Sequence, residues 1–264
     1  MRFKIAGQVR LTGVSEAGKT AYVIRAYEKL LSGVYFDGIK LSVNSNQLLD
    51  EMSALYSSPE QFISRTRETK PYKFEFLIDD EYCFTVIFVD IRGGDVSQKF
   101  MEVVEDGMED IIFTVFNCEQ LCTATDDKFN AQLFPVIRLL EQMGTDEHGH
   151  CRNRANIFTK SDKLFDMDHP EVDNRSKIIK LYKRYIETNP NLASVMDTVN
   201  VFNSSHPSYD KSFRLEPILI VVHDLLEKER KGFTALGLKK RKLQKSLDKA
   251  VSIKGGLLIS GGLK

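Results

Sequence analysis

The chain has 264 residues, and its 37 Lys and Arg side chains balance its 37 Asp and Glu side chains. This length suits one large α/β domain with elaborations, and the balanced charge gives no reason to expect nucleic acid as a partner. No apolar run is long enough to cross a membrane and the N-terminal sequence lacks a signal-peptide core, so we expect a cytoplasmic protein. The four cysteines form no C-x-x-C pair, which favours reduced thiols: Cys83, Cys118, Cys122 and Cys151.

The first predicted elements are a strand over residues 3–12, a loop over 13–20 and a helix over 20–31. The loop reads GVSEAGKT, which matches the phosphate-binding pattern G-x-x-x-x-G-K-S/T; the alternative is an ordinary turn before a helix. In such loops main-chain N–H groups converge on a phosphate, and the positive end of the following helix faces the same anion. We expect Lys19 to neutralise the β- and γ-phosphates, and the Thr20 hydroxyl to complete a Mg²⁺ shell. The predicted phosphate-binding residues are Gly13, Ser15, Glu16, Ala17, Gly18, Lys19, Thr20 and Ala21.

Residues 37–71 are predicted to form a helical insertion, because they hold few strong apolar positions apart from a helical pattern over 44–56. Two aromatic and β-branched runs follow, over 72–78 and 82–90. The short acidic segment between them predicts a β-hairpin.

The second of these runs ends in the sequence DIRGGD, which begins at Asp90. A carboxylate at the end of a buried strand can hold a Mg²⁺-bound water, and the N–H of Gly93 can approach a γ-phosphate without a side chain in the way. The alternative is a strand end followed by a flexible turn. Beside a phosphate-binding loop, the metal-binding interpretation is favoured.

The second half alternates helices over 96–110, 129–143, 175–188 and 215–229 with strands over 111–116, 155–159 and 199–203. The strand ending at Thr159 continues into Lys160, Ser161 and Asp162. The Asp162 carboxylate can accept both the N1–H and the exocyclic amine of guanine, a pair of donors that adenine does not offer there, and the Lys160 stem can lie over the base. After the last strand, a main-chain N–H near Ser204 and Ser205 can meet the guanine O6. His223 in the final helix is expected to be a satisfied core histidine.

Four segments, GVSEAGKT, DIRGG, TKSD and NSSH, stand in the order of the motifs of Ras-like GTPases of the TRAFAC class, and residues 1–231 resemble that family. The resemblance implies a three-layer P-loop NTPase fold of the α/β class, with a six-stranded, mostly parallel sheet and helices on both faces. It also implies GTP or GDP with Mg²⁺ as ligands and a molecular-switch function with a protein effector. The insertion before the second strand is similar to the prokaryotic double-GTPase type. Thr69, or alternatively Thr66, matches the switch threonine that holds Mg²⁺ and the γ-phosphate.

The chain departs from the family pattern at two positions. Gly94 stands where a Gln usually orients the attacking water, so hydrolysis should be slow; Asp95 could reach that water and Arg92 could supply charge. Thr159 replaces the usual Asn and removes an amide that ties this motif to the phosphate-binding loop. These departures motivate one alternative to a slow GTPase that responds to an activating partner, a non-hydrolysing interaction scaffold. A P-loop kinase that acts on a small molecule is a further alternative, which gives no role to TKSD.

Residues 232–264 are predicted to form a tail outside the GTPase domain. Within it, residues 238–249 hold six basic residues and one acidic residue, with Leu238, Leu243 and Leu247 at helical spacing. Such a segment can lie on anionic lipid, pack on a partner, or be a solvated helix extension. Residues 251–264 are rich in glycine and apolar without periodicity.

Overall fold

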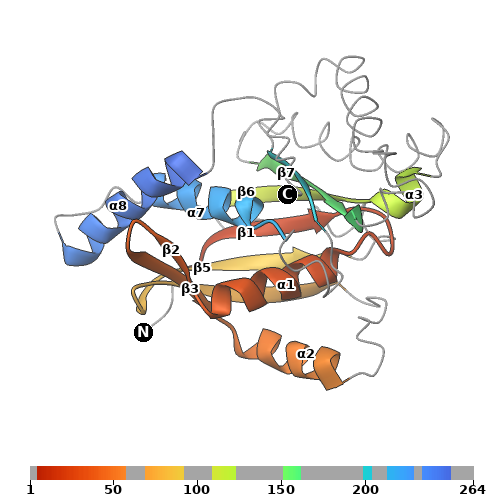
Figure 1. Cartoon of the computed structure of the whole chain (residues 1–264), viewed down its shortest axis with the longest axis horizontal. Helices are drawn as coiled ribbons and strands as arrows, with labels where there is room; N and C mark the ends of the chain where they lie inside the picture. Colours follow the sequence, from red (N-terminus) through yellow and green to blue (C-terminus); the bar gives the residue numbers. More distant parts are fainter. Residues whose placement is uncertain are drawn as a thin grey trace, which may run out of the picture.

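The computed structural model describes seven segments, residues 5–57, 69–91, 109–122, 151–161, 199–203, 213–228 and 234–250. Within them one sheet contains the strands β1 (Ile5–Thr12), β2 (Val34–Phe36), β3 (Ile39–Asn44), β4 (Lys70–Ile78), β5 (Glu81–Asp90), β6 (Glu109–Asn117), β7 (Cys151–Thr159) and β8 (Val199–Phe202). The described helices are α1 (Lys19–Leu31), α2 (Asn46–Ser57), α3 (Cys118–Cys122), α7 (Glu216–Lys228) and α8 (Ala235–Ala250) (Figure 1).

The strand order is β2-β3-β4-β5-β1-β6-β7-β8. The five strands from β5 to β8 pair in parallel, whereas β4, β3 and β2 extend the sheet in antiparallel fashion. This is the mostly parallel α/β sheet that the sequence predicts, and β1 lies inside it between two parallel neighbours. The C-terminal ends of the parallel strands therefore meet at one edge, where such sheets bind ligands.

The described sheet has eight strands, so the prediction of six strands is wrong. The two additional strands, β2 and β3, form a hairpin that the sequence analysis did not predict: β2 precedes the predicted helical insertion, and β3 lies at its start. Their turn contains Asp37 and Gly38, whose φ angles are 47° and 81°. Two successive positive φ angles are typical of the turn that joins a tight hairpin, and Asp-Gly is its strongest sequence signal. Helix α2 confirms the helical pattern that follows.

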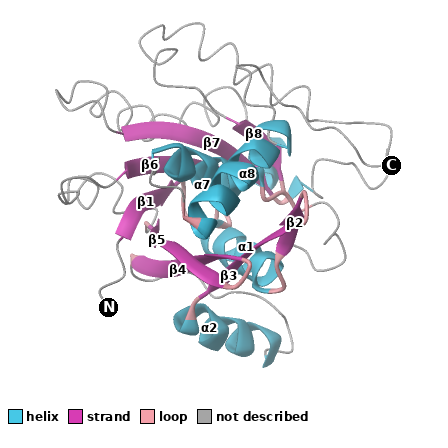
Figure 2. Cartoon of the chain, turned by 90° about the vertical axis from the view of Figure 1, so that its left-hand side faces the viewer, coloured by secondary structure: helices cyan, strands magenta, loops and turns pink. Residues whose placement is uncertain are grey.

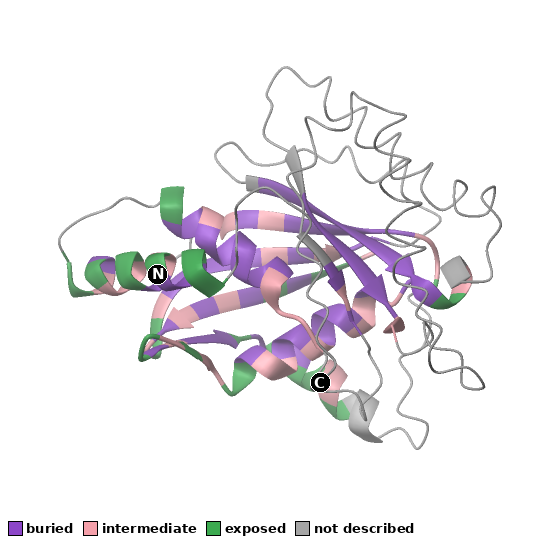
Figure 3. Cartoon of the chain, turned by 45° about the horizontal axis from the view of Figure 1, so that its top comes forward, coloured by how far each residue is buried: buried purple, intermediate pink, exposed green. Residues whose placement is uncertain are grey.

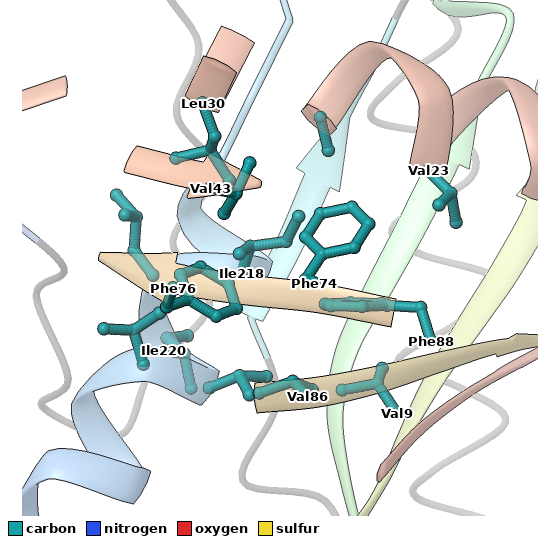
Figure 4. Packing of buried hydrophobic residues seen from close by; sticks show 14 of the residues in the cluster. Val9, Val23, Leu30, Val43, Phe74, Phe76, Val86, Phe88, Ile218 and Ile220 are labelled. Carbon is teal, nitrogen blue, oxygen red and sulfur yellow. The ribbon is translucent and has the colours of Figure 1, made fainter. Parts of the chain in front are cut away.

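The main hydrophobic core lies on one face of the sheet. Val9 of β1 is opposite Phe88 of β5 and Ile111 of β6, and all three side chains are buried. Figure 4 shows aromatic residues of β4 and β5 packed against α1 and α7, and Figure 3 shows burial continuing along the inner strands. Each fully buried side chain of this size contributes about 1.5–3 kcal/mol, so these contacts fix the helices onto the sheet.

The opposite face carries a row of stacked aromatic rings and a buried ion pair. Phe158 stacks on Phe116 and Phe202, with ring centroids 5.1 and 4.9 Å apart. Arg10 pairs with Asp110 at 2.9 Å and joins β1 to β6. The helices predicted over 96–110, 129–143 and 175–188 lie almost wholly outside the described residues, and helices on both faces of the sheet stay a prediction. Residues 109 and 110, the last two of the first predicted helix, belong instead to β6, which begins at Glu109.

Helix α8 packs against α7, β2 and β4 (Figure 2). Leu243 and Leu247 are buried in the core cluster, whereas Leu238 is exposed. Two of the three leucines predicted to form one apolar face therefore contact the rest of the chain, and a membrane or partner contact of this segment stays a prediction. No helix among the described segments has the length and apolarity to span a bilayer. The division at residue 231 also stays a prediction.

Candidate functional site

The phosphate-binding loop joins the end of β1 to the start of α1. Gly13 has a φ of 148°, and a Cβ atom built on it would lie 2.2 Å from the Val115 carbonyl oxygen of β6. Gly18, just before α1, has a φ of 84°, which disfavours any larger residue. Both glycines of the sequence pattern are therefore required by backbone conformation, and the first also by a neighbouring strand.

Lys19 folds back over the loop that precedes it. Its Nζ donates to the main-chain carbonyls of Gly13 and Val14, at 3.1 Å each. Burial lowers the pKa of Lys19, and the nearby charge of Asp90 opposes this effect. The ammonium group thus lies over the loop, held by carbonyl dipoles that the oxygens of a bound phosphate can replace.

Asp90 and Thr20 meet at the edge of the sheet beside this loop. The Thr20 hydroxyl donates to Asp90 Oδ2, and Asp90 is the fully buried last residue of β5. Lys70 pairs with Asp90 across the β4–β5 ladder, so Thr69, the residue before β4, is at the same edge. The structure therefore places Thr69 at the same edge of the sheet as Asp90, and its role as the switch threonine stays a prediction.

The donors at this edge fit a magnesium ion. Mg²⁺ prefers oxygen ligands and binds through one or two protein side chains with phosphate and water completing its shell. Thr20 and Asp90 supply a hydroxyl and a carboxylate in direct contact. The described segments hold no group of three or more His, Cys, Asp or Glu side chains that could bind a metal by themselves.

Thr159 connects the third sequence motif to the phosphate-binding loop. Its hydroxyl lies within hydrogen-bond distance of the Ala17 carbonyl and, at 3.0 Å, of the Phe116 carbonyl. The side chain is buried and also touches the position where a Cβ on Gly18 would lie. Thr159 lacks the amide of the family's usual Asn, as the sequence analysis notes, but its hydroxyl still joins this motif to the phosphate-binding loop.

Asn117 was not among the predicted site residues, and Asn203 was included only as the first residue of the NSSH motif. The Asn117 amide, at the end of β6, donates to the Glu16 carbonyl at 3.3 Å. The main chain of Asn203, just after β8, accepts from the N–H of Ser161 at 3.2 Å, and its side chain accepts from the N–H of Arg214 at 2.5 Å. Asn117 follows the strand predicted over 111–116, and Asn203 ends the strand predicted over 199–203, which was the available signal.

The structure brings together the loop over 13–18, Lys19, Thr20, Ala21, Asp90, Thr159 and Lys160. Lys160 has a φ of 53°, and its Nζ pairs with Glu119 at 2.8 Å. Several predicted residues lie outside the described segments: Thr66, Arg92, Gly93, Gly94, Asp95, Asp162, Ser204 and Ser205.

Two solved structures share this fold. The GTPase-like domain of Ski7 from S. cerevisiae, bound to GDP and inorganic phosphate, matches with a TM-score of 0.53 at 11% identity, over 88% of this chain and 52% of that chain. The signal recognition particle receptor SRb-GTP/SRX complex from Chaetomium thermophilum matches with a TM-score of 0.50 at 13% identity, over 82% of this chain and 99% of that chain. The chain thus spans about half the length of the Ski7 chain. At this level of identity the similarity shows only that the chain shares the α/β fold of these two proteins.

No protein-family model matches the sequence, and a search of curated proteins finds no match.

Proposed function

We propose that the chain binds GTP and GDP with Mg²⁺, hydrolyses GTP slowly and acts as a molecular switch of the Ras-like TRAFAC class. One contact carries the proposal: the bond between Thr159 and the Ala17 carbonyl, which places the TKSD motif directly beside the phosphate-binding loop. Because residue 159 touches the loop, a carboxylate three residues further along the chain is within reach of the base of a nucleotide whose phosphates occupy that loop. The spatial order of the motifs therefore fits one guanine nucleotide.

The residues around the loop divide the phosphate chemistry among them. Lys19 and the main-chain N–H groups of the loop stabilise negative charge on the transferring phosphoryl group. Thr20 and Thr69 would hold Mg²⁺ directly, and Asp90 would hold it through a water. When bound, the ion neutralises charge on the β- and γ-oxygens. The N–H of Gly93 would bind the γ-phosphate.

The base is read at the ends of β7 and β8. Asp162 accepts two hydrogen bonds from guanine, the Lys160 stem covers the ring, and main-chain groups near Ser204 and Ser205 meet O6. The main-chain bond from Ser161 to Asn203 supports this assignment, because it joins the two segments that carry these groups. Asn203 also accepts a hydrogen bond from the N–H of Arg214, the residue that leads into α7.

Displacement of a fluorescent GDP analogue by unlabelled nucleotides tests the guanine assignment. We expect GTP and GDP to compete at least about 100-fold better than ATP, because a site built to accept two donors rejects a base that lacks them. Asp162→Asn replaces one carboxylate oxygen, an acceptor, by an amide N–H donor. This variant should bind GDP more weakly and xanthosine diphosphate more tightly, because the 2-carbonyl of xanthine can accept a hydrogen bond from the amide. A preference for ATP would instead support the kinase. An unchanged GDP affinity in Asp162→Asn would remove the role given to Asp162.

Phosphate release over hours tests the switch. Without a Gln after Gly93, Asp95 or Arg92 would have to assist the attacking water, and we expect slow turnover that a protein partner accelerates. An effector would then recognise the segments that contact the γ-phosphate. GTP that stays bound without any turnover, alone or with candidate partners, would support the non-hydrolysing scaffold, which the glycine at position 94 favours.

A further inference from the structure

The junction between β6 and α3, residues Asn117 to Glu119, contacts two motifs of the proposed nucleotide site. Asn117 donates its amide to the Glu16 carbonyl of the phosphate-binding loop at 3.3 Å. Glu119 accepts from Lys160 Nζ of the TKSD motif at 2.8 Å. One short segment thus binds both the loop that holds phosphates and the residue whose stem would cover the base.

The Asn117 contact restrains the conformation of the loop. Glu16 has a φ of 64°, an uncommon backbone conformation for a residue with a side chain. Asn117 is buried, and its Oδ1 accepts from the N–H of Gln120 at 3.4 Å, which fixes the orientation of its amide. The amide is therefore already aimed at the Glu16 carbonyl, and the bond favours the loop conformation present in the structure.

The Glu119 contact restrains the side chain of Lys160. The ion pair joins the ammonium group to Glu119 of α3, so the Lys160 side chain runs from the end of β7 to α3. The next residue of the same motif, Ser161, donates its main-chain N–H to the Asn203 carbonyl. Both ends of the Lys160 side chain are thus held, and a base lying beneath its stem could leave only after the stem moved.

We propose that Asn117 and Glu119 are positioning residues for nucleotide binding: Asn117 acts on the phosphates through Glu16, and Glu119 acts on the base through Lys160. This inference rests on the proposed function. It predicts that Glu119 slows nucleotide dissociation only while Lys160 is present, whereas the contribution of Asn117 does not depend on Lys160.

A double-mutant cycle on the dissociation rate of fluorescent GDP from the full chain tests this coupling. Glu119→Gln should speed dissociation about threefold to fivefold, as expected for an exposed ion pair, and should have no effect in a Lys160→Ala background. Asn117→Ala should speed dissociation about tenfold in both backgrounds. Glu28→Gln is the matched control, because it removes another carboxylate from an ion pair with Arg25 on α1 and should leave the rate unchanged.

Salt provides a second measurement that a purely structural role would not affect. Raising the ionic strength screens the Glu119–Lys160 pair, so the GDP dissociation rate of the wild type should approach that of Glu119→Gln, which should itself change less.

Equal effects of Glu119→Gln on the dissociation rate with and without Lys160 would overturn the role of Glu119. If Asn117→Ala does not fold, Asn117→Ser tests the same bond, and an unchanged rate would overturn the role of Asn117. Failure of the wild-type chain to bind GDP would instead overturn the proposed function.

Discussion

The two ends of the sheet use charged side chains in opposite ways. At the end where β1 and β5 terminate, the ammonium group of Lys19 is held by main-chain carbonyls. At the other end, Lys239 of α8 pairs with the carboxylates of Asp79 and Glu81, at 3.3 and 3.0 Å. The charges of Lys239, Asp79 and Glu81 compensate one another within the chain and hold α8 in place. The Lys19 ammonium group is instead buried against main-chain carbonyls, an arrangement suited to an anionic ligand.

A substitution of Lys19 tests the difference between the two ends of the sheet most directly. Lys19→Ala should weaken GDP binding by a hundredfold or more, about 3–5 kcal/mol, because it removes a buried, hydrogen-bonded positive charge. The unfolding temperature without nucleotide should change little, since burial already disfavours the charged form. Titration with GDP and thermal unfolding measure the two effects. Lys29→Ala, at the far end of the same helix, is the control, and tight binding by Lys19→Ala would refute the role of this loop.

Substitutions in α8, at the opposite end of the sheet, should change the free energy of unfolding and not the affinity for nucleotide. Leu247→Ala removes a fully buried side chain between α8 and the rest of the chain and should cost about 2–5 kcal/mol of unfolding free energy. Leu238→Ala, an exposed leucine of the same helix, should cost far less. Urea unfolding measures the difference, and equal losses in the two variants would show that α8 is not docked as described.

Thr159 should affect both stability and nucleotide binding, because it is buried in the fold and contacts the proposed site. Thr159→Val keeps the shape but removes the hydroxyl from two main-chain carbonyls, which should cost about 1–3 kcal/mol divided between unfolding and nucleotide affinity. Thr159→Ser keeps the hydroxyl and should stay close to the wild type. The GDP dissociation rate and urea unfolding separate the two contributions. Identical rates in both variants would mean that the hydroxyl does not position the loop.

A smaller, pH-dependent effect is expected where α7 meets α8. The bond to Asp224 and the charge of Asp248 raise the pKa of His223 above its ordinary value, although burial opposes them, and Arg154 also pairs with Asp224. Because the folded pKa is raised, the stabilisation is complete below about pH 6.5 and is lost as the pH rises through the folded value. The stability difference between the wild type and Asp248→Asn, measured in urea, should therefore shrink from about pH 6 to pH 8.5. A difference that grows with pH would contradict the pairing.

The smallest effect concerns the ion pairs of Lys239. They are partly exposed, so Lys239→Gln should lower the free energy of unfolding only slightly, and most of that loss should disappear at high salt. Urea unfolding at low and high ionic strength measures this. A larger, salt-independent loss would mean that Lys239 stabilises α8 by packing and not by charge.

Sequence periodicity predicted the five strands of the parallel part of the sheet and the antiparallel hairpin partner β4, because buried apolar runs can be recognised without tertiary information. It did not predict β2 and β3, since the turn at Asp37 and Gly38 was read together with a polar, helix-like segment. Nor could it predict the Thr159 and Asn117 contacts, which join residues more than 100 positions apart. The glycine positions of the loop were predictable because backbone conformation alone dictates them.

The nucleotide that the purified chain carries, identified by chromatography after denaturation, tests the central claim most directly. A guanine nucleotide, or uptake of added GDP with Mg²⁺ in stoichiometric amount if the chain is isolated empty, is the predicted result. A bound adenine nucleotide, or an empty chain that takes up no guanine nucleotide, would contradict the account.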